Sequence, residues 1–114
     1  MQIFGRRNCK DTRKAERFFS ERGISYHFVD LAKHTPSPGE LANILRAMPS
    51  SEKLIDSESP AYEKRGLAYM DYDEAEEILA NPLLMRTPVV REAAIVIVGS
   101  KEAEWKALSE KIKK

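Results

Sequence analysis

The strongest constraint on the fold is a pair of short β-rich segments that flank one amphipathic segment near the N-terminus. Residues 1–4 are mostly apolar and end at Gly5, which is typical of a short buried strand. A helical pattern begins at about Thr12 and ends at Gly23. Residues 24–29 alternate in polarity and predict a second strand. Two strands joined by one helix form a right-handed crossover unit with parallel strands.

The C-terminal third carries a complementary pattern. Residues 88–90 and 94–98 predict two strands joined by a tight turn, although that turn lacks the usual Asn-Gly or Gly signal. Ser100 is expected to cap a last helix. The side chains expected to face inward from that helix are Trp105, Leu108 and Ile112. The order β-α-β and then β-β-α favours one mixed sheet with helices on its faces.

Between these halves the chain is predicted to be helical and irregular. Capping sequences mark three helix starts, at Ser37-Pro38-Gly39-Glu40, Ser59-Pro60 and Asp73-Glu74-Ala75-Glu76. The expected ends of these helices are Pro49, Gly66 and Asn81-Pro82. We therefore expect a single α/β domain over residues 1–114, with residues 36–85 as a helical insertion.

Length and composition exclude several classes of protein. The chain has 114 residues, 42% of them hydrophobic and 32% charged, which suits one globular domain. Its longest apolar run, residues 93–98, is far shorter than the roughly 18–20 residues that a membrane span needs. The N-terminus becomes charged at Arg6 and Arg7, before a signal-peptide core could form. We therefore expect a cytoplasmic protein that does not bind membranes.

Charge is distributed unevenly along the chain. Residues 1–35 carry eight basic and four acidic side chains, residues 40–80 four and ten, and residues 81–114 seven and four. One interpretation is scatter over a solvated surface. The other is that two basic ends fold around an anionic group and the acidic middle is an insertion. With a net charge of only +1, nothing indicates direct binding of nucleic acid.

The single cysteine, Cys9, is the first candidate for chemistry. One thiol excludes an internal disulfide and a four-thiolate zinc site, and we expect no metal. Cys9 lies between the first strand and the first helix, where free N–H groups and the helix dipole favour a thiolate. Arg13, four residues later, can share one side of the first turn with the thiol, and Lys10 is adjacent. These groups predict a lowered thiol pKa.

Thr12 could hydrogen-bond the thiolate, and the sequence alone leaves that open. The other interpretation of Cys9, a buried inert cysteine, fits this charged loop poorly. Spacing excludes two related chemistries. A dithiol pair would need cysteine at the position of Thr12, and a phosphatase loop would need arginine at the position of Ala15. The thiol must therefore react with an outside partner such as glutathione, thioredoxin or a glutaredoxin, with no bound cofactor.

Three motifs together give the chain a family resemblance. They are Ile3-Phe4-Gly5 with Cys9-Lys10-Asp11-Thr12-Arg13-Lys14-Ala15, then Tyr62-Glu63-Lys64-Arg65-Gly66-Leu67, then Met85-Arg86-Thr87-Pro88-Val89-Val90. In this order and spacing the chain resembles the arsenate reductase-like family, which includes the Spx-type regulators and the YffB-type proteins. The resemblance implies a thioredoxin-like fold with a helical insertion, in agreement with the predicted order of elements.

The resemblance also implies site residues. It assigns the nucleophile to Cys9 and an oxyanion-binding guanidinium to Arg86, and it places a cis bond between Thr87 and Pro88. The implied activity is that of a monothiol oxidoreductase. Cys9 would attack a small anionic or thiol substrate, and Arg86 would bind an oxyanion such as arsenate or the glutathione adduct.

Two departures from the family pattern bear on function. Arsenate reductases of the glutaredoxin-dependent type use a further arginine within the insertion, where this chain has the acidic stretch 54–58. Another arginine lies past the third strand, where this chain has residues 95–98, all aliphatic. These departures count against arsenate as the physiological substrate, and a less specific thiol chemistry such as glutathione-linked reduction fits the residues that remain. The alternative function is a Spx-like regulatory module that binds RNA polymerase, although these regulators usually carry a Cys-x-x-Cys pair.

Overall fold

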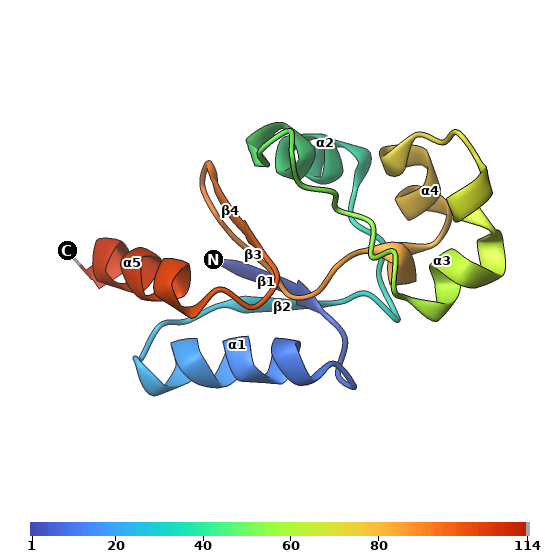
Figure 1. Cartoon of the computed structure of the whole chain (residues 1–114). Helices are drawn as coiled ribbons and strands as arrows, with labels where there is room; N and C mark the ends of the chain where they lie inside the picture. Colours follow the sequence, from blue (N-terminus) through green and yellow to red (C-terminus); the bar gives the residue numbers. More distant parts are fainter. Residues whose placement is uncertain (114) are drawn as a thin grey trace. The chain divides into compact units, whose positions relative to one another are not determined.

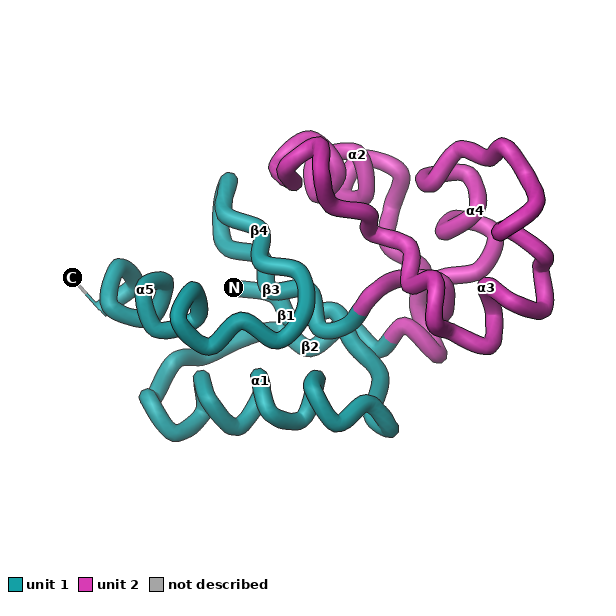
Figure 2. The backbone as a smooth tube through the Cα atoms, in the orientation of Figure 1, with its two compact units in different colours: residues 1–30, 87–114 teal, residues 31–86 magenta. Residues whose placement is uncertain are grey.

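The structure is a computed structural model that describes residues 1–113. The chain forms two compact units, which Figure 2 shows in different colours. Unit 1 comprises residues 1–30 and the chain from residue 87 onward, and unit 2 comprises residues 31–86. The predicted insertion, residues 36–85, falls inside unit 2. Among the described residues, none of the helices combines the length and the hydropathy that crossing a bilayer requires.

Unit 1 is built on a mixed four-stranded sheet with the order β2-β1-β3-β4 (Figure 1). The strands are β1 (Gln2–Gly5), β2 (His27–Asp30), β3 (Val89–Glu92) and β4 (Ile95–Val98). Strands β1 and β2 are parallel, whereas β3 is antiparallel to both β1 and β4. With helices α1 (Lys10–Glu21) and α5 (Glu102–Lys113), this is the predicted β-α-β and β-β-α order of a thioredoxin-like sheet.

One face of this sheet packs against α1 and α5. Ile3, Val90 and Ile97 are register partners in three neighbouring strands, so their side chains lie side by side. They form a buried cluster with Ala15, Phe19, Trp105 and Leu108 of the two helices. Trp105 and Leu108 thus face inward as predicted. Ile112 does not, because it is 36% exposed near the end of α5.

Helix α1 ends in a hydrogen-bonded motif, and the next strand begins only after it. Gly23 has a φ of +70°, and its N–H donates to the carbonyl of Ser20. The N–H of Ile24 donates to the carbonyl of Phe19, which completes a Schellman motif. Residues 24–26 therefore belong to the helix end and the approach to the sheet. The predicted strand at 24–29 was wrong at its start, because β2 begins at His27.

The β3–β4 turn and the start of α5 also differ from expectation. Ala93 adopts a φ of +52°, which is the left-handed conformation that a glycine usually takes in such a turn. Helix α5 begins at Glu102, and the carbonyl of Lys101 accepts the bond from the N–H of Trp105. Lys101 is therefore the N-cap residue, and the assignment of that role to Ser100 was wrong by one position.

Unit 2 contains α2 (Pro38–Ala47), α3 (Pro60–Arg65) and α4 (Glu74–Ala80), and the 3₁₀ turns η1 (Leu67–Tyr69) and η2 (Pro82–Leu84). Each predicted cap is present. Ser37 makes the full capping box with Glu40, Ser59 accepts from the N–H of Tyr62, and Asp73 accepts from the N–H of Glu76. Local hydrogen bonding thus explains why these helices begin where the sequence places them.

An extended segment ties the later part of unit 2 together. Ile55 and Met85 form an isolated antiparallel bridge. The N–H of Arg86 donates to the carbonyl of Leu54 at 2.7 Å, and the N–H of Asp56 donates to that of Leu84 at 2.8 Å. These bonds fix the chain immediately before Thr87, where it enters unit 1.

Candidate functional site

Cys9 lies between β1 and α1, as the sequence predicts. Strand β1 ends at Gly5, a short loop follows, and Cys9 is the N-cap residue of α1. The N–H of Cys9 donates to the carbonyl of Arg6, and the carbonyl of Cys9 accepts from the N–H of Arg13. Helix α1 begins at Lys10, two residues before the predicted start. The free thiol is half-buried, so it is neither sealed in the core nor fully solvated.

The residues that precede β3 bring a hydroxyl to this thiol. Strand β3 pairs with β1, which places its start beside the end of β1. The Thr87–Pro88 peptide bond is cis, as the resemblance implied. Thr87 Oγ1 donates to Cys9 Sγ at 3.1 Å, across 78 positions of sequence. The sheet thus assembles Cys9 and Thr87 into one site within unit 1.

Thr12 is the third member of this cluster. Its side chain is fully buried, and Oγ1 has no partner at regular hydrogen-bond geometry among the described residues. This hydroxyl lowers the pKa of the Cys9 thiol. Cys9 Sγ does not accept a regular N-cap hydrogen bond from the first turn of α1. The backbone N–H groups of that turn therefore act on the sulfur mainly as nearby dipoles.

The balance of these effects favours the thiolate. Burial raises the pKa of the Cys9 thiol, but the hydroxyls of Thr12 and Thr87 and the N–H groups of Thr12 and Asp11 lower it by more. The pKa of Cys9 therefore lies below its ordinary value, as the sequence predicts. The groups responsible are hydroxyl and amide donors, the type of donor that stabilises an anion without carrying charge.

The arginines near the thiol have other contacts. Arg13 Nη1 donates to the carbonyl of Arg7 at 2.9 Å. The Arg7 guanidinium lies over the ring of Phe28, 4.0 Å from its centroid, and 3.5 Å from Glu16 Oε1. These contacts hold the loop against β2 and α1. The predicted contribution of Arg13 and Lys10 to the thiol pKa stays a prediction.

Lys10 lines a cavity of about 570 Å³ on unit 1. The other lining residues are Lys14, Arg17, Phe18, Glu21 and Glu102. Lys10, Lys14 and Arg17 follow one another at helical spacing, and Lys14 forms an ion pair with Glu102 at 3.0 Å. The lining thus combines three cations, two carboxylates and one aromatic ring, and it does not include Cys9.

Arg86 is the last residue of unit 2 and directly precedes Thr87 in the chain. Its Nη1 donates to the carbonyl of Lys53 at 3.1 Å. A guanidinium has five N–H donors, so this bond leaves capacity for a second acceptor. The role of Arg86 as an oxyanion ligand stays a prediction.

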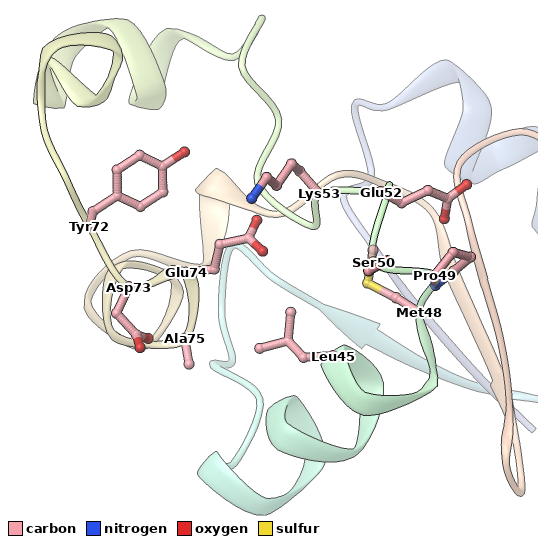
Figure 3. A pocket seen from close by; sticks show the side chains of 10 residues that line it. All are labelled: Leu45, Met48, Pro49, Ser50, Glu52, Lys53, Tyr72, Asp73, Glu74 and Ala75. Atoms are coloured by element: carbon pink, nitrogen blue, oxygen red, sulfur yellow. The ribbon is translucent and has the colours of Figure 1, made fainter.

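A further cavity, of about 440 Å³, lies within unit 2 (Figure 3). Leu45, Met48, Tyr72 and Glu74 are among its lining residues, and the lining contains no cysteine. The Glu74 carboxylate accepts from the N–H groups of Leu54 and Ile55, each at 3.0 Å. The position of the Glu74 carboxylate is therefore accounted for by the two backbone N–H groups that it accepts from.

Sequence reasoning missed two residues near the thiol. Arg6 Nη2 donates to Thr87 Oγ1 at 3.4 Å, and a Cβ on Gly5 would collide with the side chain of Thr12. Neither role has a sequence signal, because both depend on the long-range pairing of β1 with β3 and on the packing of α1 over the end of β1.

Comparison with known proteins decides the family. The sequence pattern of the ArsC family matches residues 4–108. The chain belongs to the ArsC family. A comparison with curated protein sequences finds no match. The family therefore rests on a match that spans nearly the whole chain, including Cys9, Thr12 and Thr87.

Solved structures of ArsC-type proteins share this fold. An ArsC-family-related protein from Bacteroides fragilis has a TM-score of 0.80 and 24% identity, covering 94% of this chain and 95% of that one. An arsenate reductase from Vibrio cholerae has a TM-score of 0.80 and 15% identity, covering 94% and 97%. An arsenate reductase-related protein from Brucella melitensis has a TM-score of 0.66 and 27% identity, covering 93% and 91%. The fold is thus that of the thioredoxin-like ArsC proteins.

Proposed function

We propose that this ArsC-family chain is a monothiol oxidoreductase that uses Cys9 as its nucleophile and glutathione, or a glutaredoxin or thioredoxin, as its reductant. The observation that carries the proposal is the 3.1 Å hydrogen bond from Thr87 Oγ1 to Cys9 Sγ at the N-terminus of α1. A donor aimed at the sulfur favours the thiolate, which is the nucleophilic form of cysteine.

The reaction with a glutathione disulfide balances without a cofactor. The Cys9 thiolate attacks one sulfur of the disulfide, a new S–S bond forms to Cys9, and the other glutathione leaves as a thiolate. A second thiol then attacks the glutathionyl sulfur and returns Cys9 as a thiolate. The second thiol must come from outside, because the chain contains one cysteine.

An oxyanion such as arsenate fits the same chemistry. Two thiols supply the two electrons that reduce arsenic(V) to arsenic(III), one oxygen leaves as water, and the thiols end as a disulfide. Cys9 supplies one thiol and glutathione or a protein partner the other. In this scheme Arg86 binds the oxyanion, Lys10 and Arg13 attract the anionic substrate, Thr12 and Thr87 stabilise the thiolate, and Pro88 presents the backbone beside it.

The cavity beside α1 favours glutathione as the small thiol. Glutathione carries two carboxylates, and Lys10 and Arg17 of this lining provide two cations, whereas Lys14 is paired with Glu102. We place the reaction in the cytoplasm, where a lone thiol is kept reduced and glutathione is available.

Mass spectrometry of the intact protein after treatment with oxidised glutathione tests the first step. We expect a single glutathionyl adduct on the wild type and none on Cys9→Ser. Addition of reduced glutathione should remove the adduct, and a wild type that stays unmodified would contradict the proposal.

Steady-state assays test turnover. Glutathione-dependent reduction of a small disulfide should vanish in Cys9→Ser, and Arg86→Ala should raise KM for arsenate. A Spx-like module would behave in the opposite way, because it would co-purify with RNA polymerase and this binding would persist in Cys9→Ser.

A further inference from the structure

Arg6 reaches the thiol through an intermediate hydroxyl. Arg6 Nη2 donates to Thr87 Oγ1 at 3.4 Å, and the same oxygen lies 3.1 Å from Cys9 Sγ. We propose that Arg6 is a positioning residue that acts through Thr87, turning the threonine hydroxyl so that its hydrogen points at Sγ. The inference rests on the proposed function of Cys9 as a nucleophile.

The geometry of a hydroxyl gives the relay a direction. A threonine hydroxyl has one hydrogen to donate and two lone pairs that accept, whereas a guanidinium only donates. When Arg6 occupies a lone pair of Oγ1, the hydrogen must point elsewhere, and the thiolate sulfur of Cys9 is an acceptor within reach. A donor behind the hydroxyl also polarises it, which strengthens its own hydrogen bond.

Arg6 is partly buried, and the enclosure of its Nε supports a role for its guanidinium. Arg6 Nε is buried and has no hydrogen-bond partner among the residues that the structure describes. A buried N–H on a cation lowers stability when it is not fully satisfied, so its retention requires a compensating contact. Within the part of the chain that the structure describes, Nη2 of this guanidinium donates to Thr87 Oγ1.

Neighbouring cations have different contacts. The Arg7 guanidinium lies over the ring of Phe28 and near Glu16, and Arg13 Nη1 donates to the carbonyl of Arg7. The charged side chains of the loop and first turn around Cys9 are Arg6, Arg7, Lys10, Asp11 and Arg13. On the β3 side, Thr87 and Pro88 bring no charge. A test must therefore separate a relay through Thr87 from the plain effect of one more cation.

A double-mutant cycle on the full chain makes that separation. The rate of alkylation by iodoacetamide is measured from pH 5 to pH 10 for the wild type, Arg6→Met, Thr87→Val and the double variant. We expect Arg6→Met to slow alkylation at pH 6 by about threefold, with rates that converge at pH 10. In the Thr87→Val background, Arg6→Met should change the profile little, because the relay is already broken.

Two matched variants serve as controls for the effect of charge. Arg7→Met removes a neighbouring guanidinium from the same loop and should leave the profile close to that of the wild type. Arg6→Lys, which keeps a charged donor, should retain most of the wild-type rate at pH 6. Circular dichroism melting checks folding, and Arg6→Gln replaces Arg6→Met if the latter does not fold.

The outcomes separate this inference from the proposed function. An Arg6→Met profile that matches the wild type, or an equal loss in the Thr87→Val background, would overturn the relay and leave Cys9 activated. A wild-type profile that matches free cysteine would instead overturn the proposed nucleophile, and the relay with it.

Discussion

Gly5 is packed tightly against Thr12. A Cβ placed on Gly5 would lie 2.6 Å from Thr12 Oγ1 and 3.0 Å from Thr12 Cβ, and closer still to Thr12 Cγ2. Thr12 cannot move aside easily, because it is fully buried, lies in the first turn of α1 and has a branched, stiff side chain. We predict that Gly5→Ala destabilises the protein and disturbs the thiol.

The expected size follows from two opposing effects. Forcing a methyl group into a packed site costs about 1–3 kcal/mol. Replacing glycine with alanine restricts the unfolded chain and recovers about 0.4–1 kcal/mol. The free energy of unfolding should therefore fall by about 1–2 kcal/mol, which lowers Tm by roughly 4–10 °C in a domain of this size. Because the Thr12 hydroxyl lowers the pKa of Cys9, its displacement should also slow alkylation of Cys9 at pH 6.

Urea unfolding of a double-mutant cycle measures the contact. Thr12→Ala removes both Oγ1 and Cγ2, so Gly5→Ala in that background should lose less than half as much stability as it does alone. The matched control is Gly39→Ala in α2, where a Cβ meets nothing within 4 Å, and we expect it to be neutral or stabilising. A Gly5→Ala variant as stable as the wild type, or a loss of stability that is the same in the wild-type and Thr12→Ala backgrounds, would refute this contact.

Three further predictions address charge and backbone. The pKa of Cys9 is lowered in the fold, so its ionisation adds stability that is fully present above the pKa of the unfolded thiol, about 8.5, and is lost as pH falls through the lower folded value. The stability of the reduced wild type relative to Cys9→Ser should therefore rise from pH 6 to about pH 9 in urea titrations, and a flat difference would contradict it. Ala93 has a φ of +52°, so Ala93→Gly should stabilise the protein by about 0.5–1 kcal/mol in the same assay, whereas Ala94→Gly should not. Glu74→Ala removes the acceptor of two backbone N–H groups and should cost about 2 kcal/mol, against a few tenths for Glu76→Ala, and equal losses would refute the role of Glu74.

The sequence by itself determined the elements whose signals are local. Ser37, Ser59 and Asp73 cap the helices they were expected to cap, because an N-cap side chain bonds an N–H only three residues away. The position of Cys9 between β1 and α1 was also predictable, because the signals for the end of the strand and the start of the helix lie within a few residues of it. The order of elements followed from such short-range patterns, whereas the thioredoxin-like fold was expected from the family resemblance.

Tertiary structure decided what depends on residues far apart in the chain. Thr87 donates to Cys9 across 78 positions because β3 pairs with β1, and the same pairing brings Arg6 to Thr87. The sequence shows Gly5 as the end of a strand and as part of a family motif, but not that the side chain of Thr12 fills the space beside it. The register between two strands and the packing of a helix over a strand depend on the whole core. Neither can therefore be predicted from a window of a few residues.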